Sequence, residues 1–290
     1  MVRYVIPLQF LAVAIVICAP PQTIRSLRLA SRDRLYEEPS EQDIRAAEKL
    51  FHLLLKKEHD RAALDPLLQS LRCELVELTQ NGEQFLVVKE KEAHRNGWGL
   101  YAFRRNASDA MVLDAPHSGD DAQTGMLAEL FFLESRAAAV AWSTAPRSTP
   151  TKDGRKEADL PHLPDGILHA FHRAFVAAHP QGVAIQLHGF GDSGRSISAG
   201  IIISGGSESP PDWLLKTAGS LAEKMPLPVA VYPRDVKELG GATNAHARLF
   251  RAAGHRGFAH VEMSSKMRVA LKRKPDLRQA FLRCFPGKQP

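Results

Sequence analysis

The strongest constraint on the fold is a series of short apolar segments that alternate with helical patterns. The apolar segments are typical of strands and lie at residues 84–89, 99–103, 110–115, 137–142, 183–187, 201–204, 229–232 and 257–263. Helical periodicity separates some of them, at 126–136 and 167–178, and a basic C-terminal helix is expected after the last. Strands that alternate with helices predict an α/β fold with a mostly parallel or mixed sheet sandwiched by helices.

The 290-residue chain divides by pattern into three parts. Residues 1–22 carry Arg3 and then an apolar run over about 5–19, which is short for a membrane span and typical of a signal peptide. We expect a signal peptide or an N-terminal anchor, and hence a periplasmic, secreted or envelope-anchored protein. Residues 23–83 are interpreted as a polar linker and a helical prefix, with helix over 41–78, and residues 84–290 as the main α/β domain.

Charge and cysteine content narrow the classes of partner. The net charge of +6 is mild and scattered, and no nucleic-acid-binding module is visible, so no nucleic-acid partner is expected. A mild basic bias favours an anionic substrate or envelope. Cys18 could accept a lipid, although Ile17 before it is larger than usual for such a site. Cys73 and Cys284 could pair in an oxidising compartment or remain two buried thiols.

Three predicted strands end in residues that can bind a metal or move protons. The first ends in His117-Ser-Gly-Asp120-Asp121, the second in His188, and the third carries His260-Val-Glu262. In sheets of this kind, ligands bind beyond the carboxyl ends of the strands. Two imidazoles and one carboxylate suit a catalytic zinc site with one open position for water. Another carboxylate is then needed to carry the proton, and Glu262 is available. Taken singly, each residue also fits a purely structural role.

The segment Ala-Pro-His117-Ser-Gly-Asp-Asp resembles the first metal motif of the N-formylglutamate amidohydrolase and poly-γ-glutamate hydrolase families, which are similar to zinc carboxypeptidases. The resemblance implies that His117, His188 and an acid bind zinc and that Glu262 is the general base. Carboxypeptidases use a glutamate as the acid, whereas this chain offers Asp120 or Asp121, of which we favour Asp121.

The resemblance covers about residues 84–270 and makes 84–290 a catalytic domain. It implies an exported zinc-dependent hydrolase that cleaves an amide or peptide bond in a carboxylate-bearing substrate, such as an acyl-amino acid, a γ-glutamyl polymer or a wall peptide. Arg147, after a predicted strand, is the candidate to grip the substrate carboxylate or stabilise the oxyanion. Asn244 and Arg248 are further substrate-binding candidates. Membrane contact is expected only through an uncleaved N-terminal segment.

Four histidines near the 167–178 helix are left out of the expected metal site. Leu168, Phe171 and Phe175 are interleaved with them, which indicates that this helix is mainly a packing element. The four are His162, His169, His172 and His179. Only His162, in the loop before the helix, is placed near the pocket.

Two other functions stay open. The segment Leu187-His-Gly-Phe-Gly-Asp-Ser-Gly resembles the oxyanion-hole segment of α/β-hydrolase esterases, with His260 as the triad histidine. That fold needs a Gly-x-Ser-x-Gly elbow, and Ser193, Ser196 and Ser204 all fail the spacing. The second alternative is an envelope binding protein that has lost both its metal and its catalytic activity. Metal content distinguishes the zinc hydrolase from both alternatives.

Overall fold

The computed structural model describes residues 22–287 apart from 34, 152–153, 155–156 and 192–197. Residues 1–21 of the predicted signal peptide, with the lipid-acceptor candidate Cys18, lie outside these residues. No helix within the described ranges is both long enough and apolar enough to cross a membrane.

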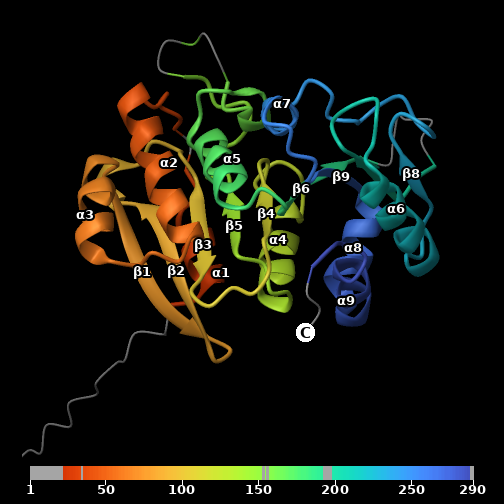
Figure 1. Ribbon diagram of the computed structural model, residues 1–290, viewed down its shortest axis with the longest axis horizontal. Helices are drawn as coiled ribbons and strands as arrows, with labels where there is room; N and C mark the ends of the chain where they lie inside the picture. The colour runs from red at the N-terminus through yellow and green to blue at the C-terminus, as the bar shows by residue number, and fades with distance from the viewer. Residues whose placement is uncertain (1–21, 34, 152–153, 155–156, 192–197, 288–290) are drawn as a thin grey trace, which may run out of the picture.

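One mixed sheet runs through the molecule (Figure 1). Among the described residues it has nine strands in the order β1-β2-β3-β5-β4-β6-β9-β7-β8. The central strands β5, β4, β6 and β9 are parallel to one another, while β1, β2 and β3 add an antiparallel edge. On the other side, β7 is antiparallel to β9 and parallel to β8. The strands are β1 Cys73–Gln80, β2 Glu83–Glu90, β3 Leu100–Arg104, β4 Met111–Ala115, β5 Ala139–Trp142, β6 Val183–Phe190, β7 Ile201–Ser204, β8 Val229–Val231 and β9 Phe258–Ser264.

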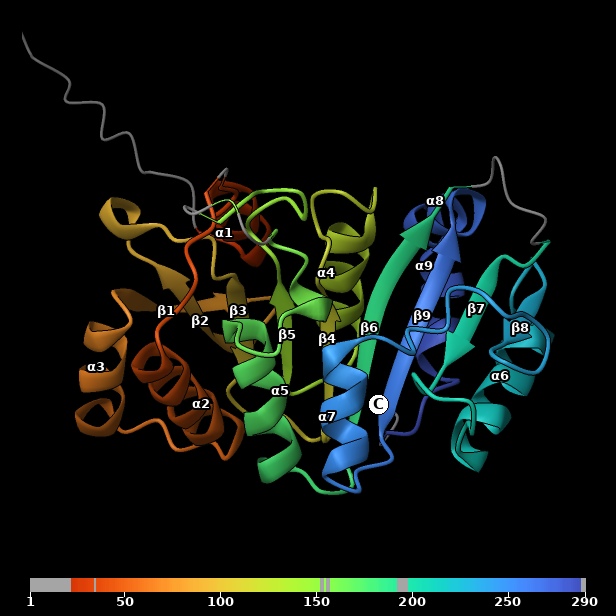
Figure 2. The same ribbon diagram turned by 90° about the horizontal axis from the view of Figure 1, so that it is seen from above.

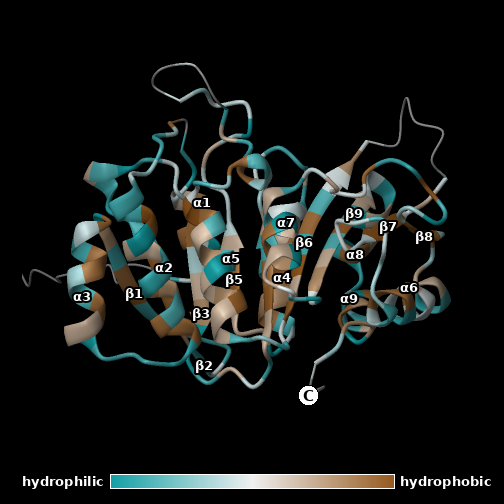
Figure 3. Cartoon of the chain, turned by 45° about the horizontal axis from the view of Figure 1, so that its top comes forward, coloured by the Kyte–Doolittle hydropathy of each residue, from teal (hydrophilic) through white to brown (hydrophobic). Residues whose placement is uncertain are grey.

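Helices cover both faces of the sheet (Figure 2). One hydrophobic core joins the sheet to α1, α4, α6, α8 and α9, and the other joins it to α2, α3, α5 and α7. Hydrophobic residues concentrate in the strands, whereas the outer loops are mostly hydrophilic (Figure 3). The helices are α1 Ile24–Ala30, α2 Glu41–Leu55, α3 Arg61–Ser70, α4 Thr124–Glu134, α5 Ile167–Ala178, α6 Asp212–Lys224, α7 Ala245–Ala252, α8 Ser265–Arg273 and α9 Pro275–Leu282.

The predicted fold class, a mixed sheet between helices with a helical prefix, is confirmed. The prediction of helix over 41–78 is wrong in its last part. The helical pattern is divided between α2 and α3, and residues 73–80 form strand β1 in register with β2. Arg72 has a left-handed backbone, with φ of 54°, where the chain turns out of α3. Pairing with β2 then outweighs the local helical pattern. The sheet therefore begins at Cys73, ahead of residue 84.

The two cysteines of the described chain are free and buried. Cys73 opens β1, and Cys284 follows α9 at the other end of the chain. Burial raises the pKa of the Cys73 thiol to about 12. Of the two alternatives, the structure has two buried thiols and no disulfide between them.

Successive side chains of the central strands point to opposite faces of the sheet, and this places their polar residues on one face. In β6, Val183, Ile185 and Leu187 face the core under α4, whereas Gln186 and His188 point to the opposite face. β9 follows the same rule, because the apolar residues at 259, 261 and 263 join that core and the polar residues at 260 and 262 do not. The polar side chains of both strands thus lie together on the side covered by α5 and α7.

Candidate metal centre

The carboxyl ends of β4, β6 and β9 lie next to one another in the sheet. β6 and β9 pair in parallel so that His188 lies beside Glu262. His117 and Asp121 belong to the turn that follows β4, where the backbone N–H of Asp121 donates to the carbonyl of His117 at 2.9 Å. This short turn brings the carboxylate back toward the imidazole that precedes it. Three segments distant in sequence therefore meet at one edge of the sheet.

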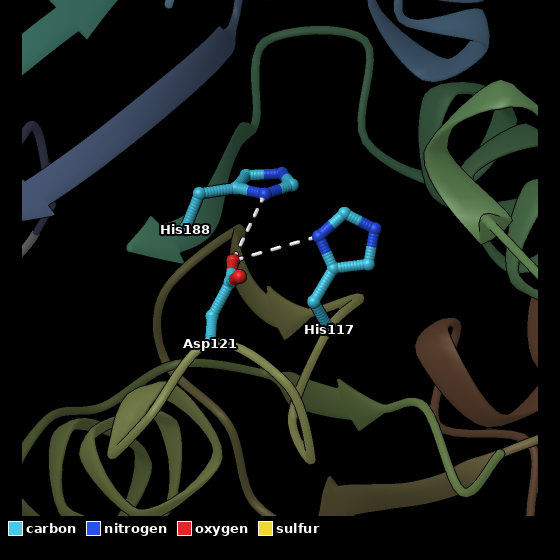
Figure 4. A group of neighbouring side chains, drawn as sticks. All are labelled: His117, Asp121 and His188. Atoms are coloured by element: carbon cyan, nitrogen blue, oxygen red, sulfur yellow. Dashed lines mark ion pairs between the residues drawn. The ribbon is translucent and has the colours of Figure 1, made fainter. Parts of the chain in front are cut away.

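His117, Asp121 and His188 form a compact group of ligand atoms (Figure 4). The Nδ1 atoms of both histidines lie 3.5 Å from the same oxygen, Oδ2 of Asp121. One ligand atom from each residue lies within 4.8 Å of the other two. In a tetrahedral site with bonds of about 2.1 Å, ligand atoms are about 3.4 Å apart. The spacing to the carboxylate therefore fits a metal ion between the three side chains.

Hydrogen bonds on the far side of each ring leave Nδ1 free to bind a metal. Nε2 of His117 lies 2.7 Å from Oδ1 of Asp159, and Nε2 of His188 lies 3.0 Å from Oε1 of Gln186. Both oxygens are acceptors, so Nε2 is the nitrogen of each ring that carries the proton when the ring is neutral. Each Nδ1 then keeps its lone pair on the side of Asp121. This is the arrangement that orients histidine ligands in metalloproteins.

The electrostatics of the group match a cation site. Although burial opposes it, the neighbouring imidazoles of His117 and His188 hold the pKa of Asp121 well below its usual range. Burial also opposes the shift at Asp159, but His117 and Arg147 lower its pKa to about 2. The pKa of His117 is raised, because its carboxylate partners outweigh burial. The pKa of His188 is lowered, first by burial and then by the nearby His260. Both carboxylates are thus ionised beside the histidines.

Glu262 lies beside this group without belonging to it. Its Oε1 is 3.4 Å from Nε2 of His260, and its Oε2 is buried without a hydrogen-bond partner. The ring of His260 also packs against that of His188, with centroids 4.4 Å apart. Burial acts to raise the pKa of Glu262, but His260 and His188 outweigh it and the pKa is lowered. The carboxylate is therefore ionised, and it belongs to a residue that lines the cavity described below while one of its oxygens makes no hydrogen bond with the described residues.

A cavity of about 600 Å³ opens above these residues. It is lined by the three candidate ligands and Glu262, and by Arg147, His162, Lys237 and Asn244 among others. The glycine pair at 240–241 forms part of its wall. Gly241 has φ of +61°, and a Cβ atom there would lie 2.9 Å from Cγ of the His260 ring. Only glycine lets this loop approach the histidine so closely.

Two of the predicted site residues lie away from the group. The Asp120 side chain is exposed and accepts the backbone N–H of Arg147 at 2.9 Å, so Asp121 and not Asp120 faces both histidines. Arg248 is exposed, donates to the carbonyl of Thr243 and is not among the described residues that line the cavity. Arg147 lines the cavity and pairs with Asp159 at 2.9 Å.

Two residues that support the candidate ligands were not singled out from the sequence. Asp159 lies in the proline-rich loop before α5, and nothing local to that loop relates it to His117. Gln186 had a signal, since a polar residue two positions before His188 in a strand must share its face. His162 lines the cavity, as expected, whereas His169 and His172 are buried in α5, close to His246 of α7.

Of the three serines considered for an esterase, only Ser204 is among the described residues, and its hydroxyl is not placed as a nucleophile for His260. Ser204 is buried, donates to the carbonyl of Gly240 at 2.7 Å and accepts the backbone N–H of Gly206 at 2.9 Å. Its hydroxyl is thus engaged by the backbone. Ser193 and Ser196, the other two candidates, lie outside the described residues.

No family model matches the sequence, and no curated protein matches it significantly. Among solved structures, the chain is similar to an aspartoacylase family protein from Mesorhizobium loti, with 15% identity over 75% of this chain and 72% of that chain and a TM-score of 0.42. It is also similar to a candidate carboxypeptidase from Burkholderia mallei, with 14% identity, coverage of 79% and 66% and a TM-score of 0.40. A gene product of Agrobacterium tumefaciens shares 14% identity, with coverage of 61% and 86% and a TM-score of 0.41.

The superpositions are partial, and we therefore draw the function of this chain from the side-chain geometry of its own site.

Proposed function

We propose that this chain is a zinc-dependent hydrolase that cleaves an amide or peptide bond. The observation that carries the proposal is the convergence of two imidazole Nδ1 atoms and one carboxylate oxygen beside a cavity that also contains Glu262. Two nitrogens and one oxygen suit zinc, whereas magnesium and calcium prefer oxygen ligands alone. With three protein ligands, one position is left open for water or substrate, as in catalytic rather than structural zinc sites.

The chain's own residues provide the proton transfers of amide hydrolysis. When bound, zinc supplies a Lewis acid that polarises a carbonyl and lowers the pKa of water. Oε2 of Glu262, which is ionised and has no hydrogen-bond partner, accepts a proton from the attacking water and returns it to the leaving nitrogen. His260 holds the other oxygen of Glu262 and so keeps the carboxylate aimed at the cavity.

The cavity favours a substrate that carries a carboxylate. Arg147 and Lys237 line it, and the Arg147 side chain is 45% exposed, so its guanidinium is accessible from the cavity. A guanidinium can grip a carboxylate through two hydrogen bonds or stabilise a developing oxyanion. Acyl-amino acids, γ-glutamyl polymers and wall peptides all have such a group. Asn244 also lines the cavity and can contact the substrate.

The N-terminal sequence supports an exported location for this activity. The apolar run after Arg3 has the length of a signal peptide, and a wall peptide is a substrate that lies outside the cytoplasm. We propose that residues 1–22 direct the chain to the periplasm, the envelope or the medium.

The first test replaces Glu262 by glutamine, which keeps the shape of the side chain and removes its basicity. The Glu262→Gln variant is expected to retain zinc and to lose about 10²–10⁴-fold in kcat, the usual contribution of a general base. The measurement is hydrolysis of a panel of acyl-amino acids and γ-glutamyl peptides, together with zinc content.

Glu208→Gln is the matched control, because Glu208 is exposed and does not line this cavity. It should behave as the wild type. Normal turnover by Glu262→Gln would remove the proposed base. Activity that survives complete zinc removal and is blocked by a serine-directed probe would instead identify a serine esterase.

A further inference from the structure

Asn244 is the residue that precedes helix α7, and its side chain has a fixed orientation. Its Oδ1 accepts the backbone N–H groups of His246 at 2.8 Å and Ala247 at 3.2 Å. These are unpaired donors of the first helical turn, which an asparagine at this position commonly satisfies. Because only the oxygen of the amide can accept them, Nδ2 must point the other way, toward strand β6.

The fixed amide of Asn244 determines the orientation of Gln186. Nδ2 of Asn244 donates to Oε1 of Gln186, so the oxygen of Gln186 faces Asn244. The other end of Gln186 agrees, because its Nε2 lies 2.9 Å from Nδ1 of His246, which can accept the hydrogen bond. Asn244, Gln186 and His246 are 2%, 0% and 0% exposed, so water does not compete for these groups.

The oriented Gln186 in turn determines which nitrogen of His188 carries the proton. Oε1 of Gln186 lies 3.0 Å from Nε2 of His188, and an amide oxygen only accepts hydrogen bonds. Nε2 of His188 therefore carries the proton, and Nδ1 presents its lone pair toward Asp121. The opposite tautomer would place a proton between His188 and Asp121, where a metal ion would have to bind.

We propose that Asn244 is a positioning residue for the metal site: by capping α7 it fixes the tautomer of His188 through Gln186. This inference rests on the proposed function, since it assigns Nδ1 of His188 as a metal ligand. Asn244 touches neither Nδ1 of His188 nor Asp121. A residue at the start of α7 thus determines which nitrogen of His188, on strand β6, carries the proton.

The substitution Asn244→Asp tests this chain of hydrogen bonds. Aspartate still caps α7, and two backbone N–H groups favour its ionised form. Aspartate has no N–H to donate, so its carboxylate oxygen would face Oε1 of Gln186. The repulsion is relieved only if the side-chain amide of Gln186 rotates by half a turn. A turned Gln186 would present its NH₂ to Nε2 of His188 and move the proton of that ring to Nδ1.

The matched control is Asn244→Ser, because serine also caps helices well but places no charge opposite Oε1 of Gln186. Zinc affinity of the full chain is measured for both variants by competition with a chelator of known affinity. The Asn244→Asp variant is expected to lose about 10–100-fold in zinc affinity, the usual effect of disturbing the partner of a histidine ligand, and Asn244→Ser much less. If the added carboxylate acted only by attracting the cation, the zinc affinity of Asn244→Asp would rise instead of falling.

A second measurement reads the tautomer itself. In the full-length metal-free chain, ¹⁵N chemical shifts of the His188 ring should show the proton on Nε2 in the wild type and on Nδ1 in Asn244→Asp. A structural role alone would lower the melting temperature of both variants and leave the tautomer unchanged.

The outcomes separate the two proposals. A wild-type chain that binds no zinc but has the proton on Nε2 would contradict the proposed function and leave the hydrogen-bond inference standing. Unchanged or tighter zinc binding by Asn244→Asp, or an unchanged tautomer, would overturn the inference while leaving the hydrolase intact.

Discussion

The two histidines of the candidate metal centre face the same carboxylate but are supported in different ways. His117 is supported by Asp159 in the loop before α5, whose side chain is 25% exposed and pairs with Arg147. His188 is supported by the fully buried Gln186, which is held by Asn244 and His246. Both supports leave Nδ1 free, so orientation of the ring requires an acceptor at Nε2 and not a particular charge.

The two supporting side chains, Asp159 and Gln186, differ in charge and in burial. The carboxylate of Asp159 carries charge and contributes to the raised pKa of His117, whereas burial and His260 lower the pKa of His188. Because the Asp159 carboxylate is 25% exposed and charged, dissolved ions partly screen its interaction with His117. The support of His188 is neutral and buried, so its strength comes from complete hydrogen bonding.

The largest effect is expected from Gln186→Leu, which removes the buried support. Leucine leaves Nδ2 of Asn244 and Nδ1 of His246 without their partner, at a cost of about 1–3 kcal/mol for each unsatisfied buried group. Zinc affinity should fall about 10–100-fold, because Nε2 of His188 also loses its acceptor. Calorimetry of unfolding and chelator competition measure the two effects.

A smaller effect is expected from Asp159→Asn, which keeps an acceptor for His117 but removes the charge. Zinc affinity should fall about tenfold, at the low end of what the loss of such a partner costs. The salt dependence of zinc binding should also weaken relative to the wild type. If Asp159→Asn lost as much affinity as Asp159→Ala, charge and not orientation would be the main contribution of this support.

The smallest effect on metal binding is expected from Arg147→Gln. Its ion pair with Asp159 is partly exposed, and such pairs contribute about 0–1 kcal/mol. Zinc content should therefore stay as in the wild type, while KM for a carboxylate-bearing substrate rises. Comparison with the corresponding amide-capped substrate isolates the effect. An equal rise in KM for both substrates would show that Arg147 does not contact the carboxylate.

Much of the fold was predictable, because apolar runs bounded by turns determine the central strands with little help from the rest of the chain. The helix at 167–178 and the strand at 201–204 agree residue for residue with α5 and β7. Strand β1 was not predictable in the same way. Its residues also continue the helical pattern of α3, and only pairing with β2 distinguishes the two conformations.

Some residues of the candidate site were also predictable from the sequence, and others were not. His117, His188 and Glu262 could be found from the sequence because each lies at or near the end of an apolar strand. Asp159 is 42 residues from His117, and Asn244 is 58 residues from Gln186, so their contacts exist only once the chain is folded. The sequence therefore indicates which atoms could bind the metal, whereas the structure shows what orients them.

The most direct test of the metal centre is elemental analysis of the purified chain beside His117→Ala and His188→Ala. We predict about one zinc ion per wild-type chain and its loss in both variants, because each removes one of the three candidate ligands found among the described residues. A wild-type chain without zinc that takes up none on reconstitution, or variants that keep a full equivalent, would contradict the assignment of this site as a zinc centre.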